Sequence, residues 1–311
     1  PLSVGVKGFV DTYHALRSGA DHDWMSSRSR VRGELTLSKG GAGAFVSANM
    51  VYNSLMKERS GLQVREAYMW CGNEHWDLRA GRQIVTWGVA DGLRVTDIIS
   101  PMDYSEFLAQ DYDDIRIPVN GLRLRYMRDR WNLEVVAVPV ASFFELPVDA
   151  VNPWSVVPRD MGVPVVMDMG SEPAHKLENM EFGTRLSMFL SGVDFSLSAL
   201  RTWNKMPVFS TTFDGTNLIA TGHYRRMTML GADVSLPLGE FVIRAEGAQY
   251  FDEAQTPAAG SDIPLSGSLN ALLGIDWYAG NDWNLSAQYS YKFIEDFSPL
   301  IGSTEHTHMG T

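Results

Sequence analysis

The chain has 311 residues and a formal net charge of −11, a length that suits either two soluble domains or one large all-β unit. A nucleic-acid partner would need clustered positive charge, so this balance argues against one. No stretch approaches the roughly 18 to 20 uncharged apolar residues of a membrane-spanning helix, which excludes a helical membrane protein. The single cysteine, Cys71, excludes an internal disulfide and a four-cysteine metal site.

Apolar and polar residues alternate with period two in segment after segment, each close to the roughly 9 to 11 residues that a tilted strand needs to cross a bilayer. In 283–293, for example, Leu285 and Tyr289 share an apolar face while Gln288 and Lys292 share the polar one. The thirteen predicted strands are 3–16, 27–38, 43–54, 62–71, 75–87, 119–128, 131–141, 181–190, 193–204, 222–236, 240–252, 267–278 and 281–294.

The links between these strands alternate between short and long. Short, glycine-bearing or charged links occur near Gly40, Asn73, Asp129, Gly192, Gly239 and Gly280. The long connections are 17–26, 55–60, 88–118, 142–180, 205–221 and 253–265. Short turns on one rim and long loops on the other are typical of an outer-membrane barrel, with periplasmic turns and extracellular loops. We therefore predict an all-β chain, a transmembrane antiparallel up-and-down β-barrel of about 14 or more strands.

Thirteen strands would leave the tail 303–311 on the extracellular side, whereas bacterial barrels have an even number. Either a strand is missed, for instance in 207–220, or the single barrel domain 1–311 lacks C-terminal strands, and we favour the second interpretation. At the other end, the sequence starts at Pro1 without a basic and then apolar leader, so we expect a mature form whose signal peptide has been removed.

Part of the sequence resembles a known family. The residues that carry the resemblance are Gly81-Arg82-Gln83, Trp87-Gly88 and Ser100-Pro101-Met102-Asp103, within 62–116. They are similar to a family of outer-membrane β-barrels of unknown function, itself similar to alginate-export-type porins. The resemblance implies a conduit for a small or lipid-like substrate. It supplies no catalytic residues.

Arginine is frequent on the polar faces of the predicted strands. An arginine-lined pore would attract anions and set selectivity. Alternatively, the arginines pair with acidic residues of neighbouring strands and fill a closed lumen. The candidate lumen residues are Arg30, Arg32, Arg79, Arg123, Arg125, Arg185, Arg244 and Glu246.

The acidic connection 88–118 is long for a compact fold, and such loops usually have a function. Pro101 begins a predicted short helix over 101–109, with acidic residues in its first turns. We expect this loop to fold inward and constrict the lumen, its carboxylates meeting Arg79, Arg123 or Arg125; a solvated cap and a Ca²⁺ site are alternatives. Its candidate residues are Asp97, Asp103, Glu106, Asp111, Asp113 and Asp114.

The connection 142–180 differs because it is long and apolar, with Phe143, Phe144 and Trp154 among many valines. Exposed apolar surface of this extent normally marks a binding site. It could line an entrance for a hydrophobic substrate or contact a partner protein. It could equally pack on the other long loop as a lid.

These observations favour an integral protein of the bacterial outer membrane that acts as a passive channel or transporter for a small or lipid-like solute. A sealed barrel that serves as scaffold or partner subunit in an envelope complex is the alternative, and an outer-membrane hydrolase is a third. We expect no catalytic residues, no metal and no other cofactor. The expected partner is outer-membrane lipid, with other envelope proteins left open.

Overall fold

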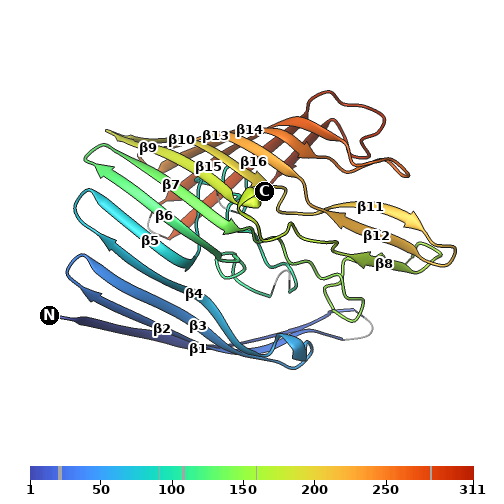
Figure 1. Cartoon of the computed structure of the whole chain (residues 1–311), viewed down its shortest axis with the longest axis horizontal. Coiled ribbons are helices and arrows are strands. Elements are labelled where there is room, and N and C mark those ends of the chain that lie inside the picture. The colour runs from blue at the N-terminus through green and yellow to red at the C-terminus, as the bar shows by residue number, and fades with distance from the viewer. Residues whose placement is uncertain (20–22, 91, 107–108, 159, 281) are drawn as a thin grey trace.

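A computed structural model describes residues 1–19, 23–90, 92–106, 109–158, 160–280 and 282–311. In these residues fourteen strands form one antiparallel sheet in which each strand pairs with the next wall strand along the chain (Figure 1). The described residues contain no helix that is long and apolar enough to cross a membrane. The all-β, up-and-down arrangement predicted from the alternation is therefore confirmed.

The wall strands, which form the large sheet, follow the predicted segments closely. They are β1 (Ser3–Leu16), β2 (Trp24–Lys39), β3 (Ala42–Asn53), β4 (Gly61–Gly72), β5 (Trp76–Gln83), β6 (Val119–Arg128), β7 (Trp131–Val140), β9 (Glu181–Leu190), β10 (Val193–Trp203), β13 (Arg226–Leu238), β14 (Phe241–Ala254), β15 (Leu265–Ala279), β16 (Trp283–Ile294) and β17 (His306–Gly310). Two short 3-10 helices, η1 (Lys57–Arg59) and η2 (Leu177–Asn179), lie in long connections.

Two predictions about strand number need correction. The tail does not remain outside the wall, because β17 returns along β16 with His306 opposite Phe293 and Gly310 opposite Tyr289. The suspected strand in 207–220 exists as β11 (Val208–Phe213), but it pairs with β12 (Leu218–His223). Together with β8 (Val165–Asp168), these strands form a separate small sheet and add nothing to the wall.

Burial along the wall strands is the reverse of that in a soluble protein. On β2 the inner side chains of Arg28, Arg30 and Arg32 are buried, whereas the alternate Val31 is 51% exposed. On β15 Asp276 is buried, whereas Leu273 is 56% exposed. An apolar outer face with a polar inner face is the pattern of a strand that lies between lipid and lumen.

The alternating connections place all short turns on one rim, because every pair of neighbouring wall strands is antiparallel. Gly40, Gly192 and Gly280 lie in these turns, and each has a positive φ that favours glycine. The prediction that these three glycines share a rim is therefore confirmed. In the described residues the edge strands β1 and β17 do not pair with each other, so the sheet is not closed.

The inner segment, residues 84–118 between β5 and β6, lies inside the curve of the sheet. Its Glu106 contacts Arg28 on β2, whereas its Val89 contacts Glu246 on β14. Since β2 and β14 are far apart in the strand order, the sheet must curl around the segment (Figure 1). The long loop thus lies within the wall and not above it.

The side of the inner segment that faces β7 to β15 is apolar. Trp87 and Ile99 from the segment are buried among inward residues of the wall. The wall residues of this core are Val119, Val136, Val138, Leu200, Met227, Met229, Ala248, Tyr250 and Leu272. A uniformly polar, arginine-lined interior is therefore wrong for this half of the barrel, where packed apolar side chains lie beside the buried carboxylates of Glu134, Asp233 and Glu246.

The helix predicted over 101–109 is also wrong for the residues that are described, 101–106 and 109; Phe107 and Leu108 lie outside them. Met102 and Asp103 are extended and form bridges with Arg116 and Glu145. The amide of Asp103 donates to the Ile115 carbonyl at 2.7 Å. These hydrogen bonds to residues distant in the sequence use the backbone groups that a helix would have paired within itself.

Candidate functional site

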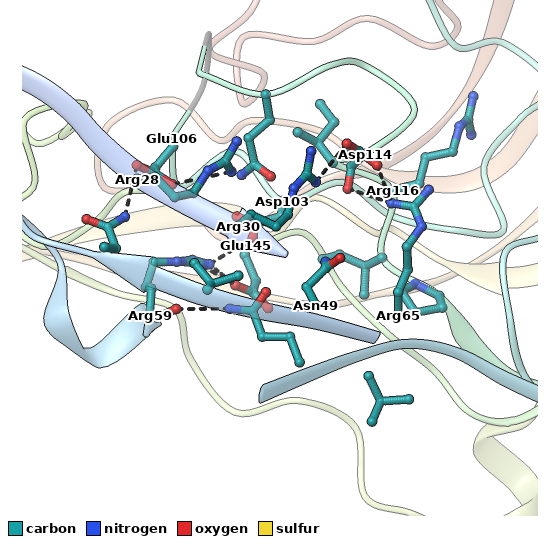
Figure 2. Close-up of a pocket in the computed structure, with 18 of the residues that line it drawn as sticks. Arg28, Arg30, Asn49, Arg59, Arg65, Asp103, Glu106, Asp114, Arg116 and Glu145 are labelled. Atoms are coloured by element: carbon teal, nitrogen blue, oxygen red, sulfur yellow. Dashed lines mark hydrogen bonds and ion pairs between the residues drawn. The ribbon is translucent and has the colours of Figure 1, made fainter. Parts of the chain in front are cut away.

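The acidic side of the inner segment faces β2, β3 and β4. Asp114 accepts from Arg30 of β2 and from Arg65 of β4, each at 2.8 Å (Figure 2). It also accepts from Arg32 of β2 at 2.8 Å. Arg30 also pairs with Asp11 of β1. Burial alone would raise the pKa of the Asp114 carboxyl, but the hydrogen bonds from Arg30 and Arg32 hold it below its ordinary value. One carboxylate thus joins the segment to two strands of the wall.

Glu106 makes a second attachment on the same side. Its Oε1 accepts from Ser26 Oγ at 3.0 Å and from Asn53 Nδ2 at 3.1 Å. Arg28 Nη1 lies 3.9 Å from the other carboxylate oxygen, and Arg28 Nη2 donates to the carbonyl of Ala109. The buried Nε of Arg28 has no hydrogen-bond partner among the described residues.

A third group of contacts connects the inner segment with the outer connections. Arg59 of η1 donates to Asp103 at 2.8 Å and to Glu145 at 2.6 Å. Asp97 pairs with Arg116 inside the segment and accepts from the amide of Trp87 at 3.0 Å. Most of the predicted loop carboxylates are therefore engaged.

Asp111 and Asp113 are the exceptions among the predicted loop carboxylates. Both residues are exposed, and Asp113 lies 3.8 Å from Arg116 across a loose contact. Neither pairs with a wall arginine in the described residues, although Asp111 lines a small cavity together with Arg28 and Arg30.

Glu246 of β14 holds the opposite side of the inner segment. Its carboxylate accepts from the amides of Val89, Ala90 and Thr96 at 2.5, 2.7 and 2.9 Å and from Thr96 Oγ1 at 2.9 Å. A Cβ at Gly88 would lie 2.6 Å from Glu246 Oε1, and Gly88 has a φ of 87°. Glycine at 88 is what lets the backbone turn this close to the carboxylate.

The other predicted lumen arginines pair within the wall. Arg123 lies 2.6 Å from Glu134, Arg185 lies 2.9 Å from Asp233, and Arg244 lies 2.9 Å from Asp276. Arg125 and Arg79 share Asp77 at 2.5 and 3.3 Å. In the described part of the chain the loop carboxylates contact Arg28, Arg30, Arg32, Arg59, Arg65, Arg94 and Arg116, so the expected contacts to Arg79, Arg123 or Arg125 are wrong.

Polar cavities lie beside the described part of the inner segment, and the two larger ones differ in their lining. The arginine cavity, about 360 Å³, lies between the segment and β2 to β4 and is lined by Arg28, Arg30, Arg59, Arg65, Arg82 and Arg116 together with five acidic residues (Figure 2). The turn-side cavity, about 380 Å³, is lined by Trp87, Arg123, Arg125, Glu134, Arg185 and Asp233 near the short turns. The segment contributes residues to both.

Sequence reasoning did not single out Arg59, Arg65 and Arg116 as site residues. Arg65 stands at a register shift between β3 and β4, where Ser47 faces Glu66 and Ala48 faces Val64. An extra residue of this kind changes which side chains point inward. The apolar and polar alternation of the sequence around it does not reveal this change. Arg59 and Arg116 lie in connections, where alternation assigns no face.

The first residues of the apolar connection 142–180 contact the inner segment. Phe144 packs on Tyr104 with 5.5 Å between ring centroids, and Asn152 Nδ2 donates to the Ser105 carbonyl at 2.8 Å. Further along, Val151 and Val156 are exposed. The lid alternative describes the first part of this connection, while its middle leaves apolar side chains uncovered.

A serine and a histidine in contact in the small sheet bear on the hydrolase alternative. Ser210 Oγ lies 2.9 Å from His223 Nε2 between β11 and β12, outside the wall. In the described residues no carboxylate orients the other ring nitrogen of His223, as a triad would require. No group of three potential metal ligands occurs among the described residues either.

Comparisons with known proteins agree with this geometry. Residues 53–135 match the model of a family described as a protein of unknown function, DUF1302. No match is found among curated proteins. The outer membrane channel DcaP of Acinetobacter baumannii has a similar fold, with a TM-score of 0.53, 11% identity and coverage of 99% of this chain and 85% of that one.

A loop-deletion mutant of OmpT, an outer membrane protein of Vibrio cholerae, is similar with a TM-score of 0.52 and 10% identity, over 94% of this chain and 82% of that one. At such identities the likeness concerns the fold. The chain has the fold of outer-membrane β-barrels, and the comparisons give no particular link to alginate-export porins.

Proposed function

We propose that this chain is an integral outer-membrane channel for a small or lipid-like solute, passive, with its lumen narrowed by the inner segment. The observation that carries the proposal is the position of residues 84–118. They lie inside the curved sheet, attached to β2 and β4 through Asp114 and to β14 through Glu246, and leave polar cavities on both sides. A permeation path with fixed charges selects solutes by charge and size.

Conductance in planar bilayers tests this function. We expect stable unitary steps from the wild-type chain. The triple variant Asp111→Asn, Asp113→Asn and Asp114→Asn should conduct more and prefer anions more strongly, since the inner segment loses three negative charges, one of them, Asp114, in the lining of the arginine cavity. Asp214→Asn, in an exposed turn of the small sheet, is the matched control and should behave as wild type. Unchanged ion preference in the triple variant would contradict the proposal.

The second candidate, a sealed barrel that serves as a scaffold, is favoured by the apolar core between the segment and β7 to β15. Packed apolar side chains at this level would narrow the path for ions between the segment and these strands. The same bilayer measurement separates the candidates. A chain that is folded, as shown by heat-modifiable gel mobility, and yet gives no conductance steps would support the scaffold.

A further inference from the structure

The wall is interrupted between β4 and β5. β3 and β4 pair from Val51 opposite Gly61 to Ala42 opposite Cys71. β4 and β5, however, pair only from Ala67 opposite Arg82 to Gly72 opposite Asp77. Beyond Gln83 the chain leaves the wall and enters the lumen as the inner segment. In Figure 1 β4 and β5 accordingly lie side by side at their short turn and diverge toward the long-loop side.

Residues 61–66 of β4 therefore present a free edge away from β3. Two side-chain hydrogen bonds cross this gap: Arg82 Nε donates to the Val64 carbonyl at 3.1 Å, and the Ile84 amide donates to Glu66 Oε1 at 2.9 Å. In hydrocarbon an open sheet edge is not tolerated, because its backbone polar groups find no partner. A polar group must cover this edge when the barrel lies in a membrane.

The arginine cavity reaches this gap. Its lining includes Val64 and Arg82, which stand at the gap, as well as Arg28 and Arg30 from the inner face of β2. Val64 belongs to the outer face of β4, where Leu62 is 68% exposed, and the neighbouring outer residues Met50 and Tyr52 of β3 are also exposed. An apolar outer strip and a charged inner cavity thus meet at one opening.

The charges of the cavity indicate what it accepts. Asp114, Asp103 and Glu145 are each within 2.8 Å of an arginine. The guanidinium of Arg82, by contrast, has no carboxylate within ion-pair distance among the described residues, and its only hydrogen bond there is the one to the Val64 carbonyl. Deeper in the cavity, the buried Nε of Arg28 also lacks a partner in that part of the chain. Unused guanidinium donors favour an anionic ligand such as a carboxylate.

We propose that the gap is a lateral portal through which a single-chain amphiphile with a carboxylate head enters the arginine cavity from the membrane. Its head contacts Arg82 first and Arg28 further in, while its aliphatic chain lies along Leu62 and Val64. The head group also supplies the polar atoms that the free edge of β4 needs. This inference rests on the proposed membrane location and names the substrate class of the proposed channel.

Photo-crosslinking in lipid nanodiscs tests the portal. The probe is a long-chain fatty acid with a diazirine next to its carboxylate, and mass spectrometry locates the label. We expect label on residues 61–66 and 109–118, competed by excess oleate but not by acetate or by dodecyltrimethylammonium, which lack the tail and the negative head respectively. Arg82→Gln should reduce this label about tenfold, because it removes a charged hydrogen-bond donor.

Arg201→Gln is the matched control, since Arg201 is an exposed arginine of β10 whose guanidinium donates to Thr228 Oγ1 at 2.8 Å. Val64→Trp should also abolish the label by filling the opening, in a barrel whose heat-modifiable mobility is normal. Label on 61–66 no greater than on the lipid-facing side of β16 would overturn the proposal, as would equal competition by acetate or full labelling of Arg82→Gln. Conductance recorded on the same preparations is independent: label without conductance would refute the channel and leave the portal standing.

Discussion

Single buried carboxylates determine where the inner segment lies. Glu246 accepts four hydrogen bonds from residues 89–96 of the segment, so its charge is stabilised by backbone amides and a hydroxyl. Hydrogen bonds to a charged group each contribute about 1.5–3 kcal/mol, more than neutral ones. For the stability of this attachment, the negative charge of the Glu246 side chain therefore matters more than the shape of that side chain.

Glu246→Gln keeps the shape of the side chain and removes the charge, and its amide nitrogen cannot accept from the amides that now donate to the carboxylate. We expect a loss of roughly 1.5–3 kcal/mol in the free energy of unfolding and faster proteolysis within 84–118. Urea titration followed by gel mobility measures the first effect. Glu240→Gln at the short-turn rim should change neither, and equal stability of both variants would show that the tether is not needed.

Single residues on the outer face of the sheet allow a test of its contact with lipid. Leu273 and Leu285 are both exposed on the face that we assign to lipid. Arginine at either position should cost about 2 to 4 kcal/mol near the midplane of the bilayer. Leu273→Phe keeps the apolar surface and should fold as wild type. If both arginine variants fold in lipid with unchanged stability, the face does not contact hydrocarbon.

The elements show what alternation in a sequence can and cannot predict. Thirteen wall strands were predictable because lipid and lumen demand opposite chemistry on alternate residues. β17 was missed because His306 to Gly310 has no apolar alternation, and β11 was not placed because its sheet lies outside the wall. The partners of the loop carboxylates could not be predicted, since which wall arginines the inner segment meets depends on its path in space.

The attachment of the inner segment to β2 and β4 should depend on pH in a defined range. Because Arg30 and Arg32 lower the pKa of Asp114 below its ordinary 3.8, its contribution is complete above that value and is lost as pH falls through the lower folded-state pKa. We expect Asp114→Asn to differ from wild type in conductance at pH 7 and the two to converge when the pH falls below the folded-state pKa. A difference that persists under those conditions would contradict this account.

At the scale of the whole molecule, the wall strands pair with one another without help from the inner segment. Gln83 and Val119 are direct partners across β5 and β6 at the point where the inner segment leaves and re-enters the wall. A turn of about two to four residues can join such neighbours. Replacing 84–118 by a short glycine-bearing turn should therefore leave the strand ladder intact, lower thermal stability through loss of the apolar core, and raise conductance severalfold. A variant that folds, as judged by gel mobility, and conducts no better than wild type would show that something else blocks the lumen.

The same pairing of Gln83 with Val119 has a mechanical consequence. Both ends of the inner segment are fixed at one point of the wall, so the segment cannot leave as a detached plug and can only swing about that point. Its attachments lie on opposite sides: Asp114 and Glu106 hold it toward β2 to β4, and Glu246 holds it toward β14. Loss of the Asp114 and Glu106 contacts would leave the segment held by Glu246 and by the apolar core, so that the arginine cavity could widen. Loss of the Glu246 contacts would leave it held against β2 to β4, so the attachment that is lost decides on which side of the segment space can open.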